Sequence, residues 1–139
     1  MKKLSQNNQA VLYFVFRVFV GFAFLLHGGQ KLFGWFGGLG GGGAVELASL
    51  FGLAGIIEFF GGLFILVGLF TSIVALIAAL EMAAAYFRVH VSNGIIPLTN
   101  SGEPAWLLFA SFLVLLAYGA GKWSLEKALL KKEFWHSTK

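Results

Sequence analysis

The sequence contains no cysteine and no aspartate, and only 12% of its 139 residues are charged. Without cysteine, the chain itself cannot form disulfides, thiolate nucleophiles, iron–sulfur clusters or cysteine-ligated zinc sites. Soluble domains carry about 25% charged residues. This chain has about half that share, and 58% of its residues are hydrophobic. So few charges cannot cover a soluble surface, and the composition therefore predicts a protein of the lipid bilayer.

The net charge of +4 does not indicate nucleic-acid binding. Lys2 and Lys3 lie at one end, and five of the ten basic residues lie within residues 122–139. No basic stripe forms on a soluble face, so we expect no nucleic-acid partner. We also expect no cleaved signal peptide, because polar residues 5–9 separate the lysines from an apolar run that is longer than a signal core.

Four apolar segments approach the roughly 20 residues that a helix needs to cross a bilayer. An even number of crossings puts both chain ends on one side, and the lysines at both ends predict that this side is the cytoplasm. We therefore predict an all-α, integral membrane four-helix bundle with both termini cytoplasmic. The predicted parts are an N-terminal segment 1–9, a membrane domain 10–121 with spans 10–33, 50–70, 73–90 and 105–120, and a basic tail 122–139.

The connections carry clear turn residues. Thr71 and Ser72 predict a tight turn that makes the second and third helices antiparallel neighbours. The glycine-rich residues 34–43 predict a flexible outer loop, because a nucleotide-binding loop would need a preceding strand. The tail mixes lysines with aromatic and aliphatic residues, which fits either a short amphipathic helix on the inner leaflet or a solvated segment.

Three charged residues, Arg17, Glu58 and Glu81, fall near the middle of the predicted spans. A charge at mid-bilayer costs about 3 kcal/mol or more, so such residues pair, face the bundle interior, or contact a ligand or proton. At about 1.5 Å per residue, all three lie roughly 10–13 Å from a predicted helix end. We therefore predict a buried cluster in which Arg17 forms a structural ion pair with one glutamate and the other is protonated.

Glu58 and Glu81 are the candidate catalytic residues, as carriers of protons or contacts of a ligand; a purely structural pairing remains the alternative for both. A second polar cluster is expected at the outer ends of the helices, where we predict ligand binding. No metal site is predicted, since neither membrane histidine has a histidine four residues away or a nearby cysteine. The expected ligand-binding residues are His27, Gln30, Lys31, Arg88, His90 and Glu103.

Several short motifs in this order resemble the DoxX family of small four-helix membrane proteins. Residues 26–34 read LHGGQKLFG, and Arg17 is followed by Gly21 in the same segment. The later motifs are IEFFGG at 57–62, LVGLFT at 66–71, EMAAA at 81–85, GEPA at 102–105 and GAGKWSLE at 119–126. Named members of the family are linked to a thiosulfate:quinone oxidoreductase subunit and to membrane oxidoreductase complexes. The resemblance therefore implies a redox or quinone-associated role in a bacterial cytoplasmic (inner) membrane.

Two functions of different classes remain open from the sequence. The first is a quinone-associated subunit of an oxidoreductase system, in which His27, Gln30 or His90 holds the quinone and the two glutamates deliver protons. Because the chain has no metal or flavin signature, a partner subunit would supply the electrons. The second is a non-enzymatic membrane scaffold or a small-solute carrier. Four helices would form a solute path only as a homo-oligomer.

Overall fold

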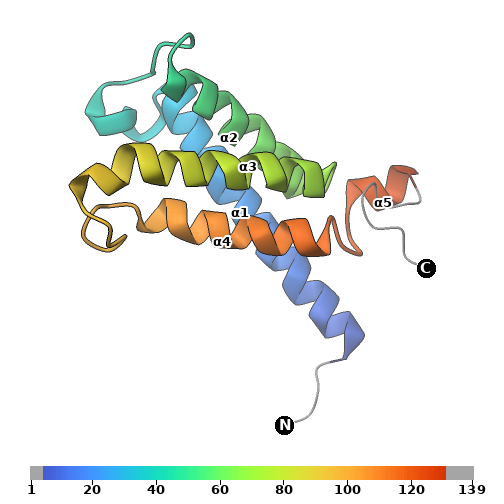
Figure 1. Cartoon of the computed structure of the whole chain (residues 1–139). Helices are drawn as coiled ribbons and strands as arrows, with labels where there is room; N and C mark the ends of the chain where they lie inside the picture. Colours follow the sequence, from blue (N-terminus) through green and yellow to red (C-terminus); the bar gives the residue numbers. More distant parts are fainter. Residues whose placement is uncertain (1–4, 131–139) are drawn as a thin grey trace.

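The computed structural model describes residues 5–130, and every regular element in this range is a helix. The predicted all-α membrane bundle is therefore confirmed (Figure 1). The helices are α1 Gln6–Phe33, α2 Leu50–Val67, α3 Thr71–Ala85, α4 Glu103–Tyr118 and α5 Leu125–Leu130. Short 3-10 turns are η1 Trp35–Gly37, η2 Leu39–Gly41 and η4 Val91–Asn93, and α3 leads into η4 through a π-helical turn, η3 Tyr86–His90.

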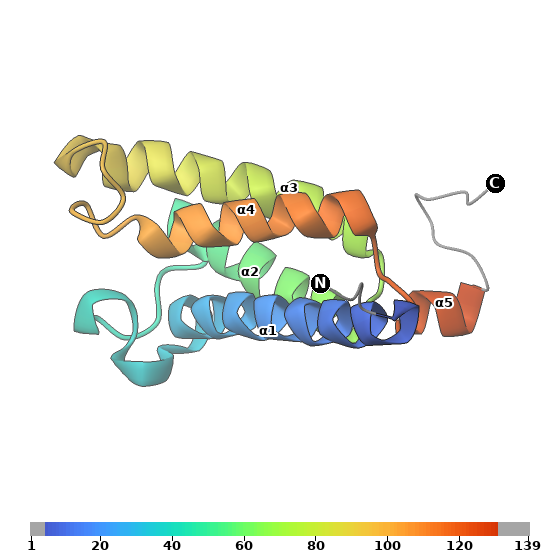
Figure 2. The ribbon, with the colours of Figure 1, turned by 90° about the horizontal axis from the view of Figure 1, so that it is seen from below.

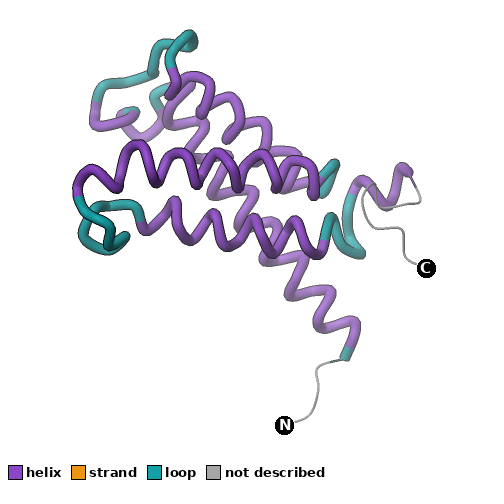
Figure 3. The backbone as a smooth tube through the Cα atoms, viewed as in Figure 1, coloured by secondary structure: helices purple, strands orange, loops and turns teal. Residues whose placement is uncertain are grey.

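Three of these helical stretches are long and apolar enough to cross a membrane: α1, α2 and the continuous helix Thr71–Asn93. The 16 residues of α4 are also apolar but make a shorter helix. All loops of the described chain lie at the helix ends, and none interrupts the middle of the bundle (Figure 3). This arrangement suits a bilayer, where an irregular segment exposed to lipid would leave backbone groups without partners.

Helix α1 is longer than the apolar pattern predicted. It begins at Gln6 and not at Ala10, because the Ser5 side chain caps the helix by accepting a hydrogen bond from the Asn8 backbone N–H, at 3.3 Å. Its 28 residues span about 42 Å, which exceeds the roughly 30 Å hydrocarbon core of a bilayer. The first turns of α1 extend beyond the end of α4 (Figure 1).

The bundle consists of two helix pairs, α1 with α2 and α3 with α4, and contacts between the pairs are sparser. The two pairs join at the turn between α2 and α3. That turn is Gly68–Phe70, with Gly68 and Phe70 at φ of 72° and 51°, so the predicted turn at Thr71 and Ser72 is wrong by a few residues. Figure 2 shows α1 starting at the same end of the bundle as α5.

Glycines set the register between α1 and α2. A Cβ atom on Gly21 would lie 2.6 Å from the Leu66 backbone nitrogen, and one on Gly62 would lie 2.7 Å from the Gly21 carbonyl oxygen. A Cβ on Gly28 would similarly lie 2.6 Å from the Cα of Phe59. Backbone therefore touches backbone along this seam, as small residues allow in membrane helix pairs. The register fixed here decides which polar side chains meet.

We expect Gly62→Ala to destabilise the protein by about 1–3 kcal/mol, because the added methyl group must push apart two backbones. The adjacent Gly61 provides a matched control, since a Cβ there would meet only the side chains of Phe24 and Val74, at 3.2 Å and 3.3 Å. Thermal unfolding in detergent would measure both variants. Equal losses for the two alanine substitutions would contradict the assigned seam.

The glycine-rich connection after α1 is folded. Gly38 and Gly43 form an isolated bridge, and the Gln30 side chain donates a hydrogen bond to the Gly38 carbonyl oxygen, at 3.3 Å. The Val45 backbone N–H donates to the Lys31 carbonyl oxygen, at 2.8 Å. These bonds hold the loop against the end of α1.

Arg17 lies at the opposite end of the bundle. Its guanidinium donates to the backbone carbonyl oxygens of Ala120 and, at 2.8 Å, Trp123, in the chain that follows α4. The predicted ion pair of Arg17 with Glu58 or Glu81 is therefore wrong. The α1–α2 register places Arg17 against Gly68, ten residues or about 15 Å along α2 from Glu58.

The start of the basic tail forms the short helix α5, whose Glu126 backbone N–H donates to the Gly68 carbonyl oxygen, at 3.0 Å. This contact ties α5 to the end of α2. The remainder of the tail, including Lys131, Lys132 and His136, lies outside the described residues.

Candidate functional site

Lys31 and Glu58 form a buried ion pair between α1 and α2. The ammonium donates to both carboxylate oxygens, at 2.9 Å and 2.6 Å, and the two side chains are 11% and 3% exposed. A Cβ on Gly55 would meet the Lys31 Cβ at 3.0 Å, so glycine at this position leaves room for the lysine to run along α2. An ion pair in so apolar a setting holds each partner in place, because either charge alone would be costly.

Glu81 approaches this pair from α3. Its carboxyl group is within electrostatic reach of both Glu58 and Lys31. Its Oε2 atom is buried and has no hydrogen-bond partner within residues 5–130. Buried polar atoms of native proteins are normally paired. An orphaned carboxyl oxygen beside a buried ion pair is therefore a place for a proton or for the donor group of a ligand.

These three side chains lie on the wall of a cavity of about 810 Å³ between the two helix pairs. Small-molecule sites usually measure about 300–1,000 Å³ and combine apolar walls with a few convergent polar groups. The polar and charged residues of this wall come from α1, α2, the α3–η3 stretch and the loop before α4. They are His27, Gln30, Lys31, Glu58, Glu81, Arg88, His90 and Ser101, and most other lining residues are aliphatic.

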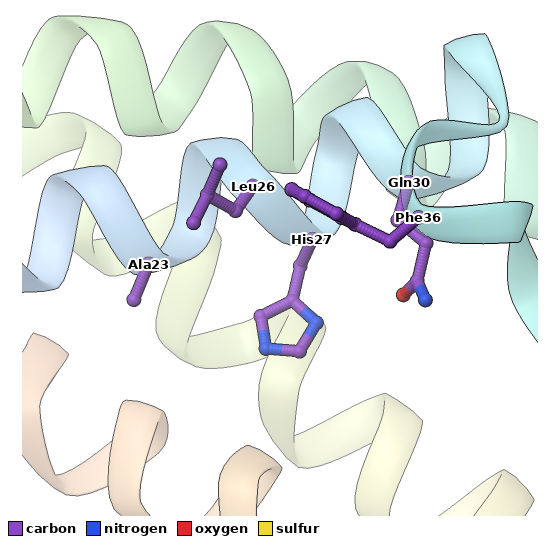
Figure 4. Close-up of a pocket in the computed structure, with 5 residues that line it drawn as sticks. All are labelled: Ala23, Leu26, His27, Gln30 and Phe36. Atoms are coloured by element: carbon purple, nitrogen blue, oxygen red, sulfur yellow. The ribbon is translucent and has the colours of Figure 1, made fainter.

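A smaller groove of about 320 Å³ runs along α1. Its lining residues are Ala23, Leu26, His27, Gln30 and Phe36, drawn in Figure 4. The His27 ring in this view stands away from the α1 backbone, and the Phe36 side chain extends from beside Gln30 toward Leu26. His27 and Gln30 line both the groove and the larger cavity, so the two spaces adjoin at these residues.

The π-helical turn η3 carries Arg88 and His90 to the cavity. A π turn closes at i→i+5, so it advances more residues per turn than an α-helix and changes which side chains face inward. The turn is held from outside: Tyr86 Oη donates to the Ile95 carbonyl oxygen at 2.5 Å, and His90 Nδ1 lies 3.1 Å from the Asn100 carbonyl oxygen. Such turns often occur at functional sites.

Residues that the sequence analysis assigned to two separate clusters line one cavity in the structure. His27, Gln30, Lys31, Arg88 and His90 line the same cavity as Glu58 and Glu81, so the prediction of two clusters at different depths is wrong. The reason is Lys31, which reaches inward to Glu58. Glu103 does not line the cavity; it is exposed in the first turn of α4, where a negative charge favours the helix N-terminus.

Two supporting residues were not predicted. Tyr86 and Asn100 are both buried and hold the η3 turn and the loop after it, and the Asn100 side chain accepts from the Gly102 backbone N–H at 2.8 Å. The Asn93-Gly94 and proline signals marked this loop, but no sequence signal indicated that it folds back on η3. Across residues 5–130, no three histidine, aspartate or glutamate side chains converge as a metal site.

Comparison with known proteins places this sequence in a family. Residues 12–91 match the sequence model of the family described as DoxX. A protein of Haemophilus influenzae, described as uncharacterized, is 38% identical over 136 residues, covering 95% of this chain and 100% of that protein. No solved structure matches the chain. The matched range contains His27, Lys31, Glu58, Glu81 and His90, and thus most of the polar cavity wall.

Proposed function

This chain belongs to the DoxX family of membrane proteins, and on that premise we propose that it is a quinone-associated membrane subunit of an oxidoreductase system. The observation that carries the proposal is the cavity of about 810 Å³. Its aliphatic walls surround the Lys31–Glu58 pair and the Glu81 oxygen that has no hydrogen-bond partner among residues 5–130. The proposed location is a bacterial cytoplasmic membrane. Both termini are proposed to lie in the cytoplasm, because basic residues flanking membrane helices favour the cytoplasmic side.

The donor set suits a flat ring with carbonyl oxygens on opposite edges. The Lys31 ammonium lies on the α1–α2 side of the cavity, and the His90 imidazole lies on the α3 side. His27 and Gln30 offer further donors from α1. The aliphatic wall, which includes Ile57 and Leu108, suits the apolar ring face. A bound quinone would supply two-electron chemistry that consumes two protons, with the electrons arriving from a partner subunit.

The residues of this chain have separate tasks in the proposal. Lys31 holds the Glu58 carboxylate in place and offers its charge to the cavity. Glu81 carries a proton on the carboxyl oxygen that has no partner within the described chain, and presents it to the ligand. Arg88 lies at the rim of the same cavity and has no ion-pair partner in the part of the chain that the structure describes.

We expect Glu81→Leu to weaken quinone binding about tenfold, the value of one lost hydrogen bond of about 1.4 kcal/mol. Folding should be unchanged, because leucine leaves no buried polar atom without a partner. Titration of the purified protein in lipid nanodiscs with a short-chain benzoquinone would measure this. Glu103→Leu is the matched control, since Glu103 lies outside the cavity wall and should leave the affinity unchanged.

Glu81→Gln separates binding from proton delivery. The amide can still donate a hydrogen bond but cannot give up a proton, so this variant should bind quinone normally and lose proton-coupled reduction in the native membrane. Wild-type affinity in Glu81→Leu would remove Glu81 from the binding site. Failure of the wild-type protein to bind any quinone would overturn the proposed function.

A further inference from the structure

We propose that the α1 groove formed by Ala23, Leu26, His27, Gln30 and Phe36 is the path by which the apolar tail of the ligand leaves the cavity for the bilayer. The inference rests on the proposed function and specifies its ligand: a quinone-type ring that carries an isoprenoid chain. The ring occupies the larger cavity, and the chain lies along α1.

Continuity between the two spaces is the first support. His27 and Gln30 line both the groove of about 320 Å³ and the cavity of about 810 Å³. The four α1 residues of the groove are spaced 0, 3, 4 and 7 along the sequence, which places them on one face of the helix. The face extends about 10 Å along the helix axis. A chain attached to a ring beside His27 can therefore follow α1 without crossing the bundle.

The chemistry of the walls is the second support. The two polar residues, His27 and Gln30, are at the junction with the cavity, and the remaining walls are Ala23, Leu26 and Phe36. A ring held by polar atoms at the junction would have its apolar substituent next to apolar walls. Phe36 lines the groove and is 78% exposed, so the groove is open to the surface beside it. Its φ of 58° is unusual for a bulky residue, so the folded loop holds it in place.

A competing path exists between α2 and α3. Ala84 and Leu53 line the larger cavity and are both exposed, so the cavity also reaches the surface there. This side of the wall is aliphatic and lacks the histidine and amide donors found at the groove junction. We therefore assign the ring substituent to the α1 side, and Ala84 provides the comparison for the test.

The test compares two probes: a benzoquinone with a short isoprenoid chain, and the same ring with a methyl group in place of the chain. Filling the groove with Ala23→Phe should weaken binding of the tailed probe at least tenfold and leave the tailless probe within twofold of wild type. Leu26→Trp fills the same groove and should act in the same way. Ala110→Phe, at an exposed position of α4 outside both spaces, should change neither affinity.

The ratio of the affinities for the tailed and the tailless probe tests whether the tail lies in the α1 groove. A selective loss of the tailed probe in Ala84→Phe, with none in Ala23→Phe or Leu26→Trp, would place the tail between α2 and α3 and overturn the assignment. An equal loss of both probes in the two groove variants would also overturn it, because the groove would then be part of the ring site. If the wild-type protein binds neither probe, the proposed function itself fails; if it binds both and the groove variants keep the wild-type ratio, only the tail path fails.

Discussion

Replacing Lys31 by methionine is expected to cost about 3–5 kcal/mol of folding free energy, because it leaves the Glu58 carboxylate buried without its counterion. The pair is joined by two hydrogen bonds at 2.9 Å and 2.6 Å, and the Glu58 side chain is only 3% exposed. Little water reaches such a site to replace the ammonium. Thermal unfolding in detergent, followed by circular dichroism, would show the loss as a lower midpoint or as protein that cannot be purified folded.

The double variant Lys31→Met, Glu58→Gln separates a stranded charge from lost packing. It removes both charges, so it should regain most of the stability that the single variant loses. Arg88→Met is the matched control, since Arg88 lines the same cavity without an ion-pair partner in the described chain and should lose little. A double variant no more stable than Lys31→Met would show that the lysine stem, and not its charge, supports the fold.

Arg17→Leu is expected to cost about 3 kcal/mol or more, since hydrogen bonds of charged groups contribute about 1.5–3 kcal/mol each. The guanidinium is 1% exposed and donates to the carbonyl oxygens of Ala120 and Trp123. Leucine would leave both oxygens without this donor. The chain after α4 should then detach from α1 before the helices unfold.

Limited trypsin digestion would test this order of events. In Arg17→Leu, cleavage after Lys122 should become fast while the helical circular dichroism signal is still native. Arg17→Lys should give an intermediate result, because one ammonium cannot reproduce the forked donors of a guanidinium. Lys122→Leu removes an exposed cation from the same segment and should leave stability unchanged. Slow cleavage at Lys122 in a folded Arg17→Leu protein would contradict the role assigned to Arg17.

Hydropathy predicted four apolar segments because lipid demands long apolar stretches, and each of them is helical in the structure, three being long enough to cross a membrane. It did not predict where α1 begins. The residues from Gln6 to Gln9 are polar, and a serine cap can start a helix among polar residues that a hydropathy pattern does not register. The wrong partner for Arg17 came from the assumption that α1 starts level with the end of α2, whereas Arg17, 11 residues into α1, lies against Gly68 at that end.

The sequence was a better guide to the polar residues of the cavity than to the ion pairs that they form. Of the charged residues at the middle of apolar segments, Glu58 and Glu81 line the cavity, whereas Arg17 lies at the other end of the bundle. The Lys31–Glu58 pair was missed because Lys31 was placed at the membrane edge. The seam of Gly21, Gly28 and Gly62 could have corrected this, since aligning the glycines of two antiparallel helices brings Lys31 beside Glu58. The η3 turn depends on contacts from a distant loop and leaves no local pattern.

The central claim is that the cavity around Lys31, Glu58 and Glu81 binds a quinone. Mass spectrometry of the protein purified from its own membrane in mild detergent tests it most directly, because bound small molecules and partner subunits are seen together. The account predicts close to one quinone per chain in the wild-type protein, and a clear loss in Glu81→Leu with Glu103→Leu unchanged. Bulk lipid alone in the wild-type protein, with or without a bound partner protein, would contradict it.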